Sequence, residues 1–463
     1  MIVINMLFYT MVLLILIIEA ASFSEYTEEL RLKFRSRFSH VCSKYQFVQD
    51  YEKQLRKPRE NYFIFVFYEA GQRGGAGGGL GDRLGGMITG FAYALRTNRT
   101  FLLQGDPALE ALFRPYEFSP TLDAEKSWGS WDWADWHREY SWNMSKLSCV
   151  NPKPGNTQCA LDSIHHDANR FKVIKYYGNR SYLCRWMKLL QDEEEKRNLL
   201  TTLGVDRDAN LYEVAGCLLR LVMYPTEKLW QQVDSFIANT MVAGSTLRFS
   251  RHQVGVHFRC GDSSFDPNNK DKPPNPECYY SPAVPWHGTN FGDDQTMDSP
   301  LDLAYCVNRS LLHAQRHDSP YTMHMNQSVV FVASDNRDSA RQMMQHLDSG
   351  NIIYPREACH IDSAGTHHDC SEDTLVQWFT LGQSDIVVTQ ESLMQDGGPY
   401  NDIATPQEVA LRSPAPISAF SRFAVIYGLS SRSLRYGNCR SIDPVSLSHY
   451  SHGNWVCVPR MFY

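Results

Sequence analysis

A glycine-rich stretch between a predicted strand and a predicted helix constrains this chain more than any other feature. Residues 74–86 read GGAGGGLGDRLGG, in which eight of thirteen positions are glycine. The run NYFIFVFYEA (61–70) before it is continuous and β-rich, which is typical of a buried strand of a parallel sheet. LGGMITGFAYALR has the apolar spacing of a helix, and TFLLQ after it is strand-like. Together these segments predict a β-loop-α-β unit.

Strand and helix segments also alternate in the second half of the chain. QVGVHFR (253–259) and SVVFVAS (328–334) are predicted strands, and helix and strand patterns alternate from there to SAFSRFAVIYGL. This rhythm predicts an α/β fold with a parallel sheet covered on both faces, and a boundary between two α/β halves near residue 245. Before that boundary, ANLYEVAGCLLRLVMYP and TEKLWQQVDSFIANTM predict two helices broken at Pro225.

The first 22 residues form a nearly continuous apolar run with no charged side chain before Glu19. Such a run predicts either a cleaved signal peptide or a signal anchor, and both direct the chain into the secretory pathway. We therefore expect the lumen of the Golgi or the endoplasmic reticulum, with a single-pass type II membrane topology if the segment is retained. Residues 23–60 are charged and contain a helical pattern, which predicts a stem packed loosely on the rest of the chain.

The cysteines of the chain agree with this compartment and argue against a zinc site, and its net charge argues against nucleic-acid binding. The twelve cysteines include no CxxC pair and no His/Cys spacing suited to zinc, so several disulfides are expected. The net charge of -6 argues against nucleic-acid binding, which needs a basic face. Five N-x-S/T sequons fit a luminal chain, at Asn98, Asn143, Asn179, Asn308 and Asn326.

Chemically useful side chains follow several of the predicted strands, where ligands of open parallel sheets bind. HFRCGD carries Arg259, whose planar guanidinium can bind a phosphate, with His257 on the same strand face. Asp335 in ASDN can accept hydrogen bonds from a ribose or a base edge. Ser418 and Ser421 open a helix, whose free N–H groups suit an anion. The structural alternatives are an ion pair for Arg259 and helix capping for Asp335 and the two serines.

Taken in order, GLGDRL, HFRCGD, FVASDN, QSDIVV and SAFSRFA resemble motifs of the GDP-fucose-dependent fucosyltransferase superfamily. This grouping includes the α1,6-, nodulation, plant cell-wall and protein O-fucosyltransferases. The resemblance implies a GT-B-like fold of two Rossmann-like domains facing a cleft. Residues 61–245 would form an N-terminal α/β acceptor-side domain, and residues 246–463 a C-terminal α/β GDP-sugar-binding domain. It also implies GDP-β-L-fucose as the donor, inversion at the sugar carbon, and neither metal nor cofactor.

The resemblance assigns roles to individual residues. Arg259 looks like the family arginine that neutralises the β-phosphate as GDP leaves, and His257 like its neighbour in the donor site. Ser334 and Asp335 would contact the nucleoside. The residues that would contact the phosphates and the fucose are Ser418, Ser421 and, in the glycine loop, Gly79, Leu80, Gly81 and Arg83.

The sequence does not select one catalytic base. Three aspartates are candidates, and the reaction can also proceed without a base. Asp82 stands where the family often has asparagine, Asp262 ends the HFRCGD motif, and Asp266 lies shortly after it. The acceptor is open as well, because the chain departs from the α1,6 branch at three positions: Ser263, Pro267 and Gln377.

We therefore expect an inverting fucosyltransferase that moves L-fucose from GDP-fucose to a glycan or protein hydroxyl. The main alternative is a catalytically inactive glycan-binding or scaffold protein on the same fold, with the five tryptophans of residues 128–142 as its sugar-binding surface. Two weaker alternatives are a dinucleotide-binding turn with Asp106 on the ribose, and a metal-dependent transferase using Asp206 and Asp208.

Overall fold

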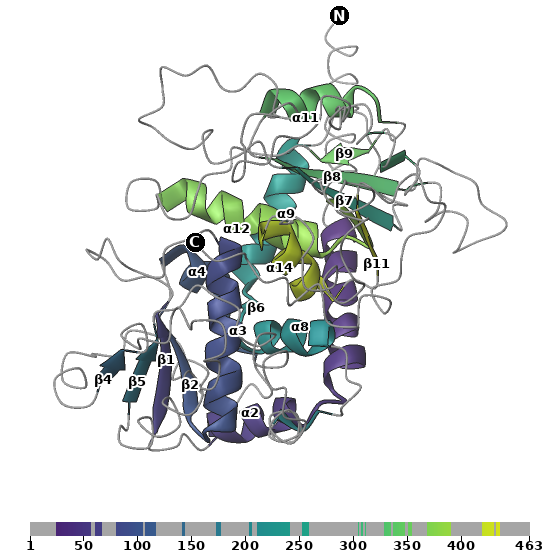
Figure 1. Ribbon diagram of the computed structural model, residues 1–463. Helices are drawn as coiled ribbons and strands as arrows, with labels where there is room; N and C mark the ends of the chain where they lie inside the picture. Colours follow the sequence, from purple (N-terminus) through teal and green to yellow (C-terminus); the bar gives the residue numbers. More distant parts are fainter. Residues whose placement is uncertain are drawn as a thin grey trace, which may run out of the picture.

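The computed structural model contains two parallel sheets, a short antiparallel pair of strands, and helices that lie mostly between the two parallel sheets (Figure 1). The residues that it describes are 25–56, 61–66, 80–104, 107–116, 141–143, 173–176, 203–205, 211–240, 252–258, 304, 307–308, 311, 328–334, 337–347, 351–353, 368–389, 419–429 and 432–435.

The first sheet contains the β-loop-α-β unit that the glycine-rich stretch predicts. Its order is β2-β1-β5-β4, and all its pairings are parallel. Helix α3 (Leu80–Arg96) connects β1 to β2, and the turn after it contains Asn98 at a left-handed φ of 59°, which asparagine tolerates better than most residues. The strands are β1 (Tyr62–Val66), β2 (Thr100–Gln104), β4 (Ser141–Asn143) and β5 (Val173–Tyr176).

The second sheet confirms the parallel arrangement expected for the second half of the chain. Its order is β11-β10-β7-β8-β9, again with parallel pairings throughout. Its edge strand β11 is not predicted by the sequence pattern. The strands are β7 (His252–Phe258), β8 (Ser328–Ser334), β9 (Ile352–Ile353), β10 (Ile386–Thr389) and β11 (Arg432–Arg435).

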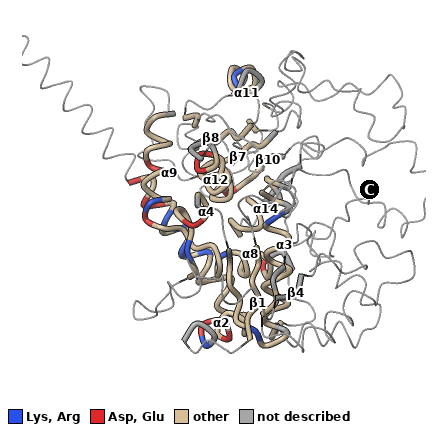
Figure 2. The backbone as a smooth tube through the Cα atoms, turned by 90° about the vertical axis from the view of Figure 1, so that its left-hand side faces the viewer, with Lys and Arg blue, Asp and Glu red and all other residues tan. Residues whose placement is uncertain are grey.

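A layer of helices lies between the two sheets, as both Figure 1 and the rotated view in Figure 2 show. The predicted break between two helices is confirmed: α8 and α9 flank Pro225, which belongs to a short antiparallel pair of β3 (Phe113–Arg114) and β6 (Tyr224–Pro225). Besides the N-terminal helix and α3, the helices that the structure describes are α2 (Gln46–Arg56), α4 (Pro107–Leu112), α8 (Leu211–Val222), α9 (Glu227–Thr240), α11 (Arg337–Met344), α12 (His368–Gly382) and α14 (Ala419–Gly428). Of these, α11 lies on the outer side of the second sheet, away from the first sheet (Figure 1 and Figure 2).

The N-terminal helix (residues 25–42) is part of this helical layer, so the expectation of a loosely packed stem is wrong. Phe34 is fully buried and lies 5.8 Å from the ring of Tyr427 and 5.9 Å from that of Phe379, measured between ring centroids. A disulfide between Cys42 and Cys217 joins the helix to α8. The physical reason is the spacing of its buried apolar residues, which recur every fourth position: Tyr26, Leu30, Phe34, Phe38 and Cys42.

Across the ranges given above, no helix is both long enough and apolar enough to cross a bilayer. The predicted signal peptide or anchor, residues 1–22, lies outside them.

Candidate functional site

The order of strands in the second sheet marks a ligand site beside β7. From β7 the chain moves to β8 and then β9 on one side, and it returns to β10 and β11 on the other side. The direction of winding therefore reverses between β7 and β10. In open parallel sheets, ligands bind beyond the carboxyl ends of the strands at such a switch point. HFRCGD spans the carboxyl end of β7 and the residues directly after it, so this motif leaves the sheet at the switch point.

The first sheet has the same feature beside β1. Strand β2 lies on one side of β1, whereas β5 and β4 lie on the other. The switch point is between β1 and β5, and the glycine-rich stretch is the segment that comes after β1 and leads into α3. The two most distinctive motifs of the sequence thus each follow the chain out of the strand at which the winding of a sheet reverses. HFRCGD begins with the last two residues of β7, and the glycine-rich stretch begins at Gly74, after β1 ends at Val66.

His257 is the next-to-last residue of β7 and is 7% exposed. It shares a face of the strand with Gly255, where a side chain would collide with Leu381 of α12 and with Ser384, which comes after that helix. On this face the imidazole of His257 stacks on the ring of Phe420 in the first turn of α14, with centroids 5.0 Å apart and ring planes at 28°. The structure therefore joins the HFRCGD and SAFSRFA motifs through two side chains.

Ser334 reaches the same edge of the sheet but lies on the other face. It ends β8, pairs with Phe258 and is buried. Along β8, Val330 and Val332 belong to the cluster that includes buried residues of α11, whereas Phe331 and Ala333 belong to the main core. Because side chains alternate along a strand, Ser334 falls on the α11 face. A ligand that contacts both His257 and Ser334 would have to span the carboxyl edge of the sheet.

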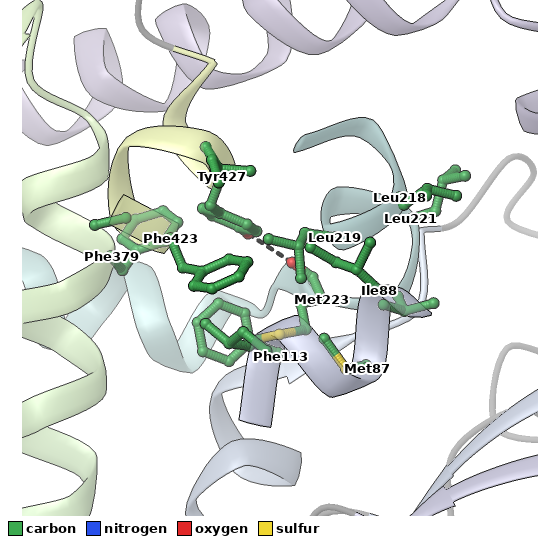
Figure 3. Packing of buried hydrophobic residues seen from close by; sticks show 14 of the residues in the cluster. Met87, Ile88, Phe113, Leu218, Leu219, Leu221, Met223, Phe379, Phe423 and Tyr427 are labelled. Carbon is green, nitrogen blue, oxygen red and sulfur yellow. Dashed lines mark hydrogen bonds between the residues drawn. The ribbon is translucent and has the colours of Figure 1, made fainter. Parts of the chain in front are cut away.

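Helix α14 is held tightly in the helical layer, which fixes the position of its first turn. A Cβ on Gly428 would lie 1.7 Å from the carbonyl oxygen of Gly382 in α12, and one on Gly216 of α8 would lie 2.4 Å from the carbonyl of Ile426. Tyr427 donates a 2.5 Å hydrogen bond to the carbonyl of Met223, as Figure 3 shows. Ser421, near the other end of α14, is fully buried.

The residues at the start of α3 come from the glycine-rich stretch. Leu80, Gly81 and Arg83 are buried in the first turn of the helix, and α3 packs against both α14 and α8. Asp82 is the third residue of α3. An acidic residue in a helix's first turn is stabilised by the helix dipole, so this position suits a helix-stabilising role as well as a base.

The other candidate residues lie outside the described ranges, and their roles stay predictions. The same holds for the tryptophan-rich segment 128–142 and for the carboxylates of the two weaker alternatives. Of all residues that the structure describes, none belong to a group of three or more His, Cys, Asp or Glu that could hold a metal ion. The candidates without a described position are Gly79, Arg259, Asp262, Asp266, Asp335 and Ser418.

Asp385, in the QSDIVV motif, forms a charged cluster at the opposite, amino edge of the second sheet. It binds Lys33 and Arg37 of the N-terminal helix, with Arg37 Nη2 at 3.0 Å, and accepts a 3.0 Å hydrogen bond from the backbone N–H of Gln253. Burial alone raises the pKa of Asp385, but the two cations outweigh burial and hold its pKa below the ordinary value. Asp385 is thus structural, and it attaches the N-terminal helix to the second sheet.

Arg220 is a second structural residue, and unlike Asp385 it belongs to none of the sequence motifs. It is fully buried in α8, and its guanidinium donates to three backbone carbonyls: Nε to Tyr427 at 2.6 Å, Nη1 to Phe34 at 2.8 Å and Nη2 to Gly428 at 2.8 Å. The guanidinium also lies 3.9 Å from the centroid of the Phe34 ring, a cation–π contact. Arg220 therefore binds the carboxyl end of α14, where the helix dipole is negative, to the N-terminal helix.

No protein-family model matches the chain, and no curated protein matches it in sequence. Solved structures similar to it include a mutant of Arabidopsis thaliana FUT1 in complex with GDP, at 12% identity and a TM-score of 0.44 over 88% of this chain and 79% of that chain. The fucosyltransferase NodZ from Bradyrhizobium matches at 13% identity and a TM-score of 0.36, over 82% of this chain and 96% of that one. These neighbours are fucosyltransferases, as are the proteins whose motifs the sequence resembles. The likeness is distant, and this chain's own residues carry the functional argument.

Proposed function

We propose that this protein is an inverting fucosyltransferase that transfers L-fucose from GDP-fucose to a hydroxyl of a glycan or a protein. One observation carries the proposal: the glycine-rich motif and HFRCGD resemble the superfamily's motifs, and each lies on the carboxyl side of the strand at the switch point of a separate parallel sheet. HFRCGD begins with the last two residues of β7, and the glycine-rich motif begins at Gly74, after β1 ends at Val66. A donor bound between two such edges is the arrangement that two facing Rossmann-like domains provide.

In the proposed reaction, an oxygen of the acceptor attacks the anomeric carbon of fucose from the side opposite to the diphosphate. The bond from that carbon to the phosphate oxygen breaks, and its electron pair leaves on the β-phosphate of GDP. Arg259 neutralises this developing charge with a bidentate guanidinium. The amino end of α14, with Ser421 in its first turn and His257 against Phe420, supports the diphosphate through helix N–H groups.

The proton of the acceptor hydroxyl passes to Asp82, to Asp262 or Asp266, or directly to solvent. Asp82 is the candidate whose backbone position supports the role, because the first turn of α3 comes after the switch point of the first sheet. Ser334, the last residue of β8, and Asp335, the next residue in the sequence, contact the nucleoside. The proposal includes a location in the lumen of the Golgi or the endoplasmic reticulum, supported by the apolar run at residues 1–22 and the sequons.

Nucleotide binding tests the proposal first. A chain starting at residue 23 retains every described residue, and GDP at a hundred times its Kd should raise its free energy of unfolding by about 2.7 kcal/mol. UDP and ADP at the same concentration should raise it far less. Incubation with GDP-fucose and an array of glycans and glycoproteins, read by mass spectrometry, should then show one added deoxyhexose.

Two results would reject the proposal. The first is a melting curve that none of the three nucleotides changes. The second is stabilisation by a glycan with no response to GDP, which would support the inactive glycan-binding alternative. Product formation that stops in excess EDTA and returns with Mn²⁺ would instead replace the metal-free chemistry with the metal-dependent alternative.

A further inference from the structure

The stacked pair of His257 and Phe420 connects the two motifs of the second sheet that the proposed function uses. His257 lies near the carboxyl end of β7, and the rest of HFRCGD continues from it. Phe420 is the second residue of α14 and is half-buried, with its ring packed against the main core as well as against the imidazole. No role in the reaction arises from the phenylalanine's own chemistry, since its side chain has neither a charge nor a hydrogen-bonding group.

A stacked aromatic ring restricts what the imidazole can do. The ring planes are 28° apart with centroids at 5.0 Å, so Phe420 covers one face of His257 and limits its rotation about the Cβ–Cγ bond. The nitrogens of the imidazole lie in the ring plane, so stacking on a face of the ring does not involve them. The contact therefore selects an orientation of His257 without taking up its hydrogen-bonding groups.

The phenylalanine can act in this way because its own helix cannot shift. Both Gly428 and Gly216 are in contacts too close for a Cβ, which hold α14 against α12 and α8. Arg220 binds the carboxyl end of α14 with two hydrogen bonds of 2.6 and 2.8 Å. The position of Phe420 is thus set by contacts far from the switch point.

We propose that Phe420 is a positioning residue of the donor site, which holds the His257 imidazole in the orientation that binds the diphosphate of GDP. This inference rests on the proposed function. According to this inference, Phe420 affects the affinity for GDP only by orienting His257.

A double-mutant cycle measured by GDP titration calorimetry tests the inference. Phe420→Leu keeps an apolar side chain but loses the ring, and it should weaken GDP binding about two- to tenfold, the range expected for the loss of one aromatic pair. Phe420→Tyr keeps the ring and should bind GDP within about twofold of the wild type. In a His257→Ala background, Phe420→Leu should change the Kd of GDP no further, because the side chain that it orients is gone.

Tyr427→Phe is the matched control, because it lies two turns along the same helix and loses only its 2.5 Å hydrogen bond to Met223. It should lower the melting temperature without changing the Kd of GDP. Phe420→Leu with wild-type affinity would overturn the inference, as would an equal loss of affinity with and without His257. A loss of affinity in Tyr427→Phe as large as in Phe420→Leu would also overturn it, because the effect would then track stability alone. Wild-type protein that binds no GDP would reject the proposed function and this inference together.

Discussion

Replacing Arg220 with methionine tests whether one buried guanidinium holds the helical layer together. Methionine fills a similar volume with an unbranched apolar chain but cannot donate. The change would leave the carbonyls of Phe34 and Tyr427 without the hydrogen bonds that Arg220 gives them. The carbonyl of Gly428 would keep a second donor, since Arg37 Nη1 lies 3.2 Å from it.

The expected loss in the free energy of unfolding is the balance of opposing contributions. Three hydrogen bonds from a charged donor contribute on the order of 1.5–3 kcal/mol each, and burying the guanidinium offsets several kcal/mol of that sum. Arg220→Met removes the charge itself and leaves two neutral carbonyls without these hydrogen bonds, and a buried acceptor that loses its donor costs about 1–3 kcal/mol because it stays desolvated. We expect Arg220→Met to lower the free energy of unfolding by about 2–6 kcal/mol, a large fraction of the roughly 5–15 kcal/mol that ordinary domains possess.

Equilibrium unfolding in urea measures this cost, and Arg37→Met supplies the second arm of a double-mutant cycle. Each single variant leaves Gly428 one donor, whereas the double variant leaves none from these two arginines. The double variant should therefore lose at least about 0.5 kcal/mol more than the sum of the single variants. Repulsion between the two guanidiniums acts in the same direction. Either single change relieves this repulsion, so the double variant gains no further relief and again loses more than the sum of the single variants. The proposed role of Arg220 in the helical layer would be refuted if the two losses in the free energy of unfolding were additive, or if Arg220→Met cost less than about 1 kcal/mol.

Four other substitutions test separate parts of the structure and the proposed site. Arg259→Ala should lower turnover by about 10²–10³-fold, and lysine should restore only part of it; near-normal activity with alanine would remove Arg259 from the reaction. Asp82→Asn should depress turnover with GDP affinity kept if Asp82 is the base, and a silent change in steady-state kinetics would show that it is structural. Asp385→Asn should lower the free energy of unfolding at pH 7. The difference in this free energy between the variant and the wild type should shrink as the pH falls below about 4, the unfolded-state pKa of aspartate. The pKa of Asp385 is lowered in the folded protein, so its contribution is present above that pH and is lost as the pH falls through the folded-state pKa; a gap in urea unfolding that does not change with pH would contradict this assignment. Gly428→Ala should yield little folded protein by circular dichroism, because its Cβ would lie 1.7 Å from the Gly382 carbonyl oxygen, and wild-type stability would show that α12 and α14 separate freely.

The sequence predicts the elements of this fold better than their arrangement. Runs such as SVVFVAS and TFLLQ identify buried strands because β-branched and other apolar residues are continuous there, and the structure confirms both. The edge strands β4 and β11 read SWN and RSLR, which are short and largely polar, so their local sequence carries no strand signal. The order of strands is not encoded locally either, and the switch points come only from the structure.

The charged residues of the helical layer show a different limit. Asp385 stands beside a predicted strand in a motif, but its partner Arg37 is 348 residues away in the chain. Arg220 looks like one of many helix-surface arginines until the carbonyls that it binds are known. The four-residue spacing of Phe34 and its apolar neighbours indicates a buried face, yet the charged residues between them favour the interpretation of a loose stem.

Burial of the N-terminal helix shows that the packed structure begins well before residue 61, where the sequence predicts the first domain to start. Arg220 binds Phe34 and the last two residues of α14 with one guanidinium, and α14 carries Phe420 against His257 at its other end. The first helix is therefore connected to the proposed donor site through a single rigid helix. A chain shortened to residue 23 keeps this connection, whereas one shortened to residue 61 removes the Phe34 carbonyl, the Cys42 disulfide and both cations on Asp385. The N-terminal helix therefore belongs to the same packed unit as the helix that carries the SAFSRFA motif.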